Sequence, residues 1–136
     1  MSNLSNYAET QWLNYLFGQT AIPNFGTYYV GLLTNGSFVD GNTPTENVGN
    51  GYARIAVTND KTTGFNAAVG DTVTNKNNIA FAAATGAWTD VSFAALFDAL
   101  TTGNLICWAA LQSSPVAVAS GTQLTINAGD LSFKLD

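Results

Sequence analysis

The sequence predicts a mainly β protein, an antiparallel β-sandwich or a jelly-roll-like barrel with one N-terminal α-helix. After Pro23, short runs rich in Val, Ile, Tyr, Phe and Thr alternate with clusters of Gly, Asn, Asp and Thr, as in proteins built from short strands. About seven such runs follow one another at moderate spacing, which is typical of a sandwich or barrel. A chain of 136 residues fits one domain, residues 1–136.

The first segment predicts a helix over about residues 6–17. Its apolar side chains recur at helical spacing and form one stripe: Ala8, Trp12, Leu13, Leu16 and Phe17. Asn6 is the expected N-cap, with Glu9 completing a capping box, and Gly18 ends the helix. A helix with such a stripe must lie on the sheet of its own domain or on a neighbouring subunit.

The strand signals follow in order along the rest of the chain. Strands are expected at 27–33, 52–58, 78–83, 87–96 with a break in the middle, 104–111, 123–127 and 131–136, with a weak edge strand within 66–78. In the last strand Leu131, Phe133 and Leu135 alternate with polar residues, so they should share one buried face. Segment 104–111 is apolar on both faces, which predicts a central strand.

The longest segment without periodicity is 34–51, and loops of this length are often functional. It carries Phe38 and Val39 among polar neighbours. Either Phe38 folds back onto the edge of its own domain, or the pair forms an exposed apolar plug that orders against a partner.

The charge balance argues against several function classes. Four basic and nine acidic residues give a net charge of −5, so no basic stripe is present to bind nucleic acid or an anionic membrane. No histidine is present, which removes the Ser-His-Asp and Cys-His arrangements and most transition-metal sites. No apolar run has the length of a membrane span and the N-terminus lacks the features of a secretory signal, so we expect synthesis in the cytosol.

The carboxylates offer no convincing catalytic pair. Asp90 and Asp98 flank an apolar run, and Asp40 and Glu46 share the long loop, but Asp98 is better explained as a turn or capping residue. The Asp40–Glu46 stretch lacks the ligand pattern of a calcium loop. We therefore expect no catalytic residue, no metal ligand and no cofactor site.

Two further residues have a structural and a functional interpretation. Cys107 lies in the most apolar strand, where a thiol behaves as a small buried hydrophobe with a raised pKa. Arg54 either pairs with an acid across the sheet or anchors an interface. The candidate interface residues are Phe38, Val39, Arg54 and Trp12. The aromatic residues are better explained as core than as a carbohydrate-binding platform.

Several stretches together resemble a family of small phage virion proteins of the tail-fibre-like type. They are LSNYAETQWLNYLFG, YYVGLLT, ENVGNGYARI, IAFAAATGAWTDVSFAALFDA, TTGNLICWAAL and SGTQLTINAGDLSFKLD, so the resemblance runs nearly end to end. Relatives often carry a glycine where this chain has Thr89, and a double glycine where it has Thr102 and Gly103.

The resemblance implies a non-enzymatic building block of a tailed phage particle, made in the host cytoplasm. A chain without repeats or heptads lacks the length of a fibre, which favours a capsid decoration (cement) protein on the capsid surface. Its partners would be the major capsid protein and itself, as a homotrimer or another cyclic oligomer. The alternative is a tail fibre, tail or baseplate appendage that contacts the host surface and other tail proteins.

Overall fold

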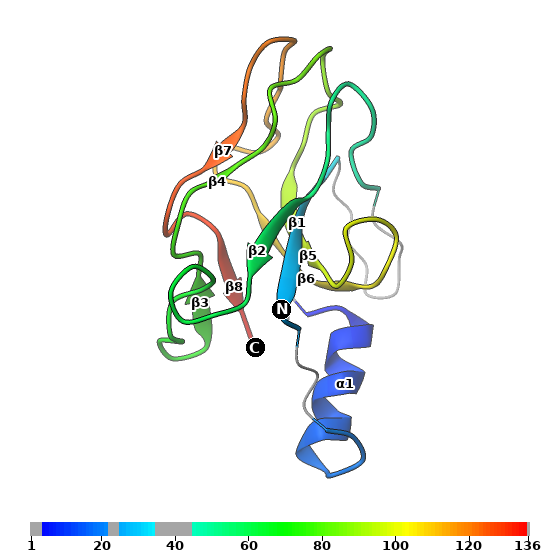
Figure 1. Ribbon diagram of the computed structural model, residues 1–136, viewed down its shortest axis with the longest axis vertical. Coiled ribbons are helices and arrows are strands. Elements are labelled where there is room, and N and C mark those ends of the chain that lie inside the picture. Colours follow the sequence, from blue (N-terminus) through cyan, green and yellow to red (C-terminus); the bar gives the residue numbers. More distant parts are fainter. Residues whose placement is uncertain (1–3, 22–24, 35–44, 136) are drawn as a thin grey trace.

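The computed structural model describes residues 4–21, 25–34 and 45–135. In these residues one helix, α1 (Asn6–Leu16), accompanies eight strands arranged in three antiparallel sheets (Figure 1). The predicted class, mainly β with one N-terminal helix, is confirmed.

The largest sheet has four strands in the order β2-β1-β5-β6. They are β2 (Ile55–Thr58), β1 (Thr27–Leu33), β5 (Phe93–Phe97) and β6 (Leu105–Ala110). Val30 of β1 lies opposite Ile55 on one side and Leu96 on the other. Every neighbouring pair is antiparallel.

Two small sheets form the second layer. β3 (Thr72–Thr74) pairs with β8 (Ser132–Lys134), and β4 (Ile79–Ala80) pairs with β7 (Thr125–Ile126). Beyond these strands, isolated bridges continue the contact: the Val91 N–H donates to the Val116 carbonyl at 3.0 Å and the Val116 N–H donates to the Val91 carbonyl at 2.7 Å. This irregular pairing explains why the strands expected at 78–83, 87–96 and 123–127 are shorter in the structure.

The main core lies between the two layers, as in a β-sandwich. Val30 and Leu32 of β1 and Ala94 and Leu96 of β5 share one buried cluster with Ile79, Ile126 and Phe133 of the small sheets. A second cluster lies on the opposite face of the four-stranded sheet and contains Leu33, Ala95, Phe97 and Trp108. The two faces of this sheet are therefore both apolar.

Strand β6 is buried on both faces, but the prediction that it is central is wrong. It is the last strand of the four-stranded sheet, and its outer edge receives the chain that enters α1. Leu4 bridges to Cys107, and the Ser5 N–H donates to the Ile106 carbonyl at 2.8 Å. An edge strand can be this apolar because a second segment of the chain covers it.

Helix α1 agrees with the predicted helix to within one residue, but its cap differs. The N-cap is Ser5, whose hydroxyl accepts the Ala8 N–H at 3.2 Å and also bonds to the Leu105 carbonyl. Asn6 is instead the first helical residue. The anchoring of Ser5 on β6 starts the helix one residue earlier than the sequence indicates.

Replacing Ser5 by alanine should therefore lower the free energy of unfolding by about 1–2 kcal/mol, since an N-cap and a bond to β6 are lost together. Chemical denaturation measures the change. The control is Ser132→Ala, at an exposed position of β8, which should have little effect. Equal effects at the two positions would contradict the assigned cap.

The remaining strand predictions hold in part. Strand 27–33 is confirmed residue for residue as β1, and the weak edge strand within 66–78 is present as β3. In the last strand Leu131 and Phe133 are buried as predicted. Leu135 is 44% exposed, so its predicted burial is wrong.

Candidate functional site

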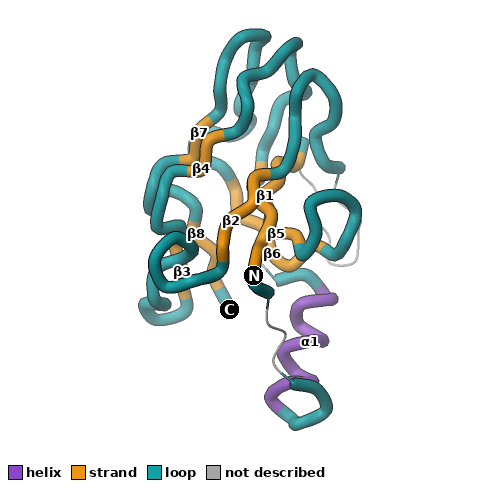
Figure 2. The backbone as a smooth tube through the Cα atoms, viewed as in Figure 1, coloured by secondary structure: helices purple, strands orange, loops and turns teal. Residues whose placement is uncertain are grey.

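Helix α1 extends away from the β-sandwich formed by β1–β8, which we call the β-body, instead of lying across a sheet (Figure 2). It is attached at its N-terminal end, where Ser5 is bonded to β6, and Ala8 is its buried residue. The rest of the apolar stripe faces outward: Trp12 is 44% exposed, Leu13 55%, Leu16 58% and Phe17 75%. Contiguous apolar side chains on a surface mark sites of protein contact.

A groove of about 620 Å³ lies between α1 and the β3-β8 sheet. Its lining comes from several distant parts of the chain: Tyr7, Ala8, Gln11 and Trp12 of α1; Phe25 and Tyr28 at the start of β1; Phe65, Ala68, Val73 and Asp71 around β3; Leu96 of β5; Ile106 and Cys107 of β6; and Phe133, Lys134 and Leu135 of the last strand. Most of these side chains are apolar. The charged members Asp71 and Lys134 pair with each other at 3.5 Å.

The helix presents two different apolar sides. Successive residues of a helix are about 100° apart, so Leu13, Leu16 and Phe17 lie on a side that does not line the groove. We call these three residues the outer ridge. Trp12 lies at the boundary, since it lines the groove and borders the outer ridge.

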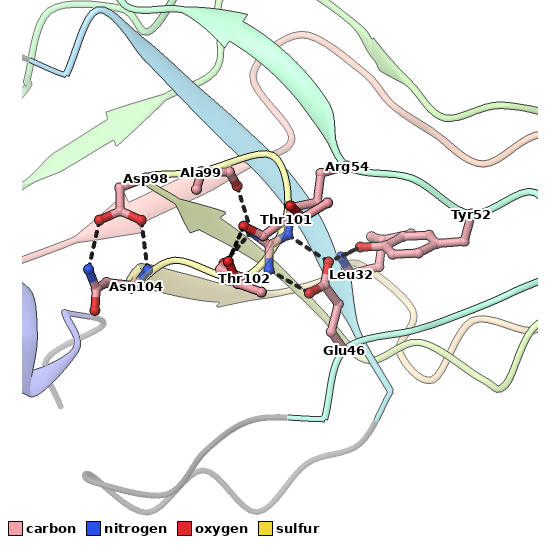
Figure 3. A network of polar contacts seen from close by, with 9 residues as sticks. All are labelled: Leu32, Glu46, Tyr52, Arg54, Asp98, Ala99, Thr101, Thr102 and Asn104. Carbon is pink, nitrogen blue, oxygen red and sulfur yellow. Dashed lines mark hydrogen bonds and ion pairs between the residues drawn. The ribbon is translucent and has the colours of Figure 1, made fainter.

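The structure places the second candidate residue, Arg54, in a polar network beneath the surface (Figure 3). Its Nε and Nη2 atoms donate to the two carboxylate oxygens of Glu46 at 2.8 and 2.6 Å. Nη1 donates to the carbonyls of Ala99 and Thr102 at 2.6 and 2.8 Å. The guanidinium lies 3.5 Å from the ring centre of Phe97, a cation–π geometry. Arg54, directly before β2, therefore connects the β5–β6 loop with the segment that precedes β2 and carries Glu46.

Tyr52 and Gly31 complete this network. The Tyr52 hydroxyl donates to Glu46 Oε1 at 2.7 Å and accepts the Leu32 N–H at 2.8 Å. Burial, above all, raises the pKa of Tyr52. A Cβ atom at Gly31 would lie 2.9 Å from Glu46 Oε1, so this close approach requires glycine.

The pairing that the sequence allowed for Arg54 is thus present, with Glu46 as the acid. Arg54 is only 8% exposed. Its role in an interface stays a prediction. Phe38, Val39 and Asp40 lie outside the described residues.

The structural interpretation of Asp98 agrees with its contacts. Its carboxylate accepts the Asn104 N–H at 2.6 Å and the Asn104 side-chain amide at 2.9 Å, which closes the β5–β6 loop (Figure 3). Among the described residues, no cluster of three or more His, Cys, Asp or Glu side chains could hold a metal. In the same part of the chain, no helix has the length and apolar character needed to cross a bilayer.

Cys107 is 4% exposed, and burial raises the pKa of its thiol. In native protein at mildly alkaline pH we therefore expect Cys107 to stay protonated and to react with Ellman's reagent only very slowly. Protein unfolded in guanidinium should react at the rate of a free thiol. Rapid labelling of the native protein would contradict the burial of this side chain.

Sequence reasoning identified the apolar stripe of α1 but missed the groove. Phe25, Phe65 and Phe133 come from segments far apart in the sequence, and nothing in their local patterns indicates that they meet beside α1.

A β-sandwich that carries an uncovered apolar helix has the features of a structural subunit, which acts through contacts with other proteins. Residues 3–134 match the family described as Podophage GP4 fiber I protein gp80. The chain belongs to this family, which confirms the resemblance to phage tail-fibre-like structural proteins. No curated protein matches the chain.

Proposed function

We propose that this protein is a non-enzymatic subunit of a fibre-type appendage on a podophage particle, held in place through α1. The observation that carries the proposal is the match of 132 of 136 residues, 3–134, to a family described by a fibre protein. Because the match spans nearly the whole chain, it includes α1 and the body together.

The geometry supports attachment through the helix. The outer ridge and Trp12 leave apolar surface in water at a cost of about 25 cal/mol per Å². A partner that covers these side chains removes this cost, so the uncovered helix favours the assembled state. The β-body supplies a rigid base, because α1 starts directly at the edge of β6.

A capsid decoration protein is the second candidate. It is favoured by the dimensions of α1, whose 11 residues span about 16 Å at the helical rise of 1.5 Å per residue. The described chain thus has no long element of its own from which to build a shaft. In this case the partner is the major capsid protein and the location is the capsid surface.

Purified particles distinguish the two candidates. Tails and capsids are separated, and the chain is quantified in each fraction by mass spectrometry against known tail and capsid proteins. A fibre subunit should stay with the tail fraction in a copy number that is a small multiple of the tail symmetry. Recovery with the capsids at a copy number comparable with that of the capsid subunits would overturn the fibre proposal and support decoration.

A further inference from the structure

The two apolar features beside α1 differ in shape. The outer ridge (Leu13, Leu16, Phe17) projects from the helix with 55–75% of each residue exposed, while the groove on the other side of the helix is concave. Both are present in every copy of the chain, and in a single copy no other described segment covers them. We infer that they bind each other between copies, so that the outer ridge of one subunit enters the groove of the next in a closed ring.

The sizes of the two features are compatible. A volume of about 620 Å³ lies within the range of sites that enclose a drug-sized ligand. The groove can therefore accept the ends of two leucines and one phenylalanine. Its lining includes apolar side chains of α1 and of β3 and β8, so the ridge would contact apolar side chains from both.

The apolar area that each copy can bury favours a contact between the ridge of one copy and the groove of another. An aromatic side chain carries about 150–250 Å², so the outer ridge with Trp12 offers on the order of 400–500 Å² per copy, against about 800 Å² per partner in a standard interface. Two copies that met ridge to ridge would bury only this area and leave both grooves open. In a ring each copy buries its ridge and its groove, which roughly doubles the area per copy.

The charges permit this contact between identical chains. Each copy carries a net charge of −5, so an interface with exposed acids would be repulsive. The three ridge residues are uncharged, and the charged lining residues of the groove, Asp71 and Lys134, already pair with each other. The three ridge residues therefore bring no charge of their own into the groove.

A contact between two different surfaces of the same chain joins subunits head to tail, and such contacts close into rings when the rotation between subunits permits. The homotrimer expected from the sequence is one such ring. This inference names a partner for α1 and rests on the proposed function only in taking assembly as the role of the helix. Ring formation is measured in solution, whereas the fibre proposal is tested on particles, so either can fail alone.

The first measurement is the mass of the purified full-length protein by size-exclusion chromatography with light scattering. The expected value is a single integral multiple, three or more, of 14.2 kDa. Leu16→Glu places a charge on the ridge and should give a monomer. The matched control is Leu100→Glu, since Leu100 is 53% exposed, close to the 58% of Leu16, and lies in neither feature. This control should keep the oligomer.

The second measurement uses a groove variant, Ala68→Glu, at an exposed lining residue. Alone it should also be monomeric. Mixed with Leu16→Glu it should form a 1:1 dimer that does not grow, because one intact ridge and one intact groove remain in the mixture. Circular dichroism checks the fold, and Leu13→Glu and Leu135→Glu replace any variant that fails to fold.

Three outcomes would overturn the inference. The wild-type protein could be monomeric at all accessible concentrations. The ridge variant could keep the wild-type mass, which would show that another surface forms the oligomer. The mixture of the two monomeric variants could remain monomeric, which would show that the ridge and the groove do not bind each other.

Discussion

Replacing Phe81 by alanine should lower the free energy of unfolding by about 3–5 kcal/mol, the usual cost of removing a buried aromatic ring. Phe81 is 0% exposed. Its ring stacks on Tyr52 with centroids 6.2 Å apart and meets Trp88 edge-on at 6.4 Å. The cavity left by the substitution would lie between the two layers of the sandwich, where neither sheet can close it without moving.

Chemical denaturation of wild type and variant gives the difference directly. The control is Phe17→Ala, which removes the same atoms from a ring that is 75% exposed. At protein concentrations too low for self-association, this change should alter the stability by less than about 0.5 kcal/mol. Similar losses at Phe81 and Phe17 would mean that the core is not packed as described.

The second large effect is expected at Arg54. Arg54→Met removes the cation and leaves the Glu46 carboxylate largely enclosed, a change that typically costs about 3–5 kcal/mol in a buried pair. The Glu46 side chain is 23% exposed, against 6% for Arg54. Solvent therefore reaches the carboxylate, and we expect a loss near 3 kcal/mol, at the lower end of this range.

Two companion variants separate the charge from the geometry. Arg54→Lys keeps the positive charge but cannot donate from two nitrogens to both oxygens of Glu46, so it should recover only part of the loss. The double variant Arg54→Met with Glu46→Gln should be more stable than Arg54→Met alone, because no unpaired charge remains. If Arg54→Met lowers the free energy of unfolding by less than about 1 kcal/mol, the Arg54–Glu46 pair behaves like a surface salt bridge. The network then does not hold the β5–β6 loop in place.

The sequence predicted those elements whose signals are local. α1 has a clear helical periodicity and β1 is a compact run of β-forming residues, and both lie within a residue of the predicted bounds. The cap of α1 could not be predicted, because Ser5 and Asn6 are both good caps and the choice depends on bonds to β6. The edge position of β6 was missed for a similar reason: its outer edge is paired with Leu4 and Ser5 from the other end of the chain.

In the candidate site, too, features with a local signal could be predicted and features that depend on contacts between distant segments could not. The apolar stripe with Trp12 could be read from spacing alone, but whether it packs on its own sheet depends on where α1 leaves the body. The groove depends on residues from many distant segments, and the pairing of Arg54 with Glu46 requires that β2 lie beside β1. Such contacts follow from topology, which a single sequence does not display.

The central claim is that the outer ridge of α1 is an assembly surface of the particle. The most direct measurement supplies phage that lacks the protein with either the Leu16→Glu or the Leu100→Glu variant and quantifies the chain in purified particles. The account predicts that Leu100→Glu is incorporated at the wild-type level, while Leu16→Glu is made in a folded form and is absent from the particles. Incorporation of Leu16→Glu at the wild-type level would contradict it.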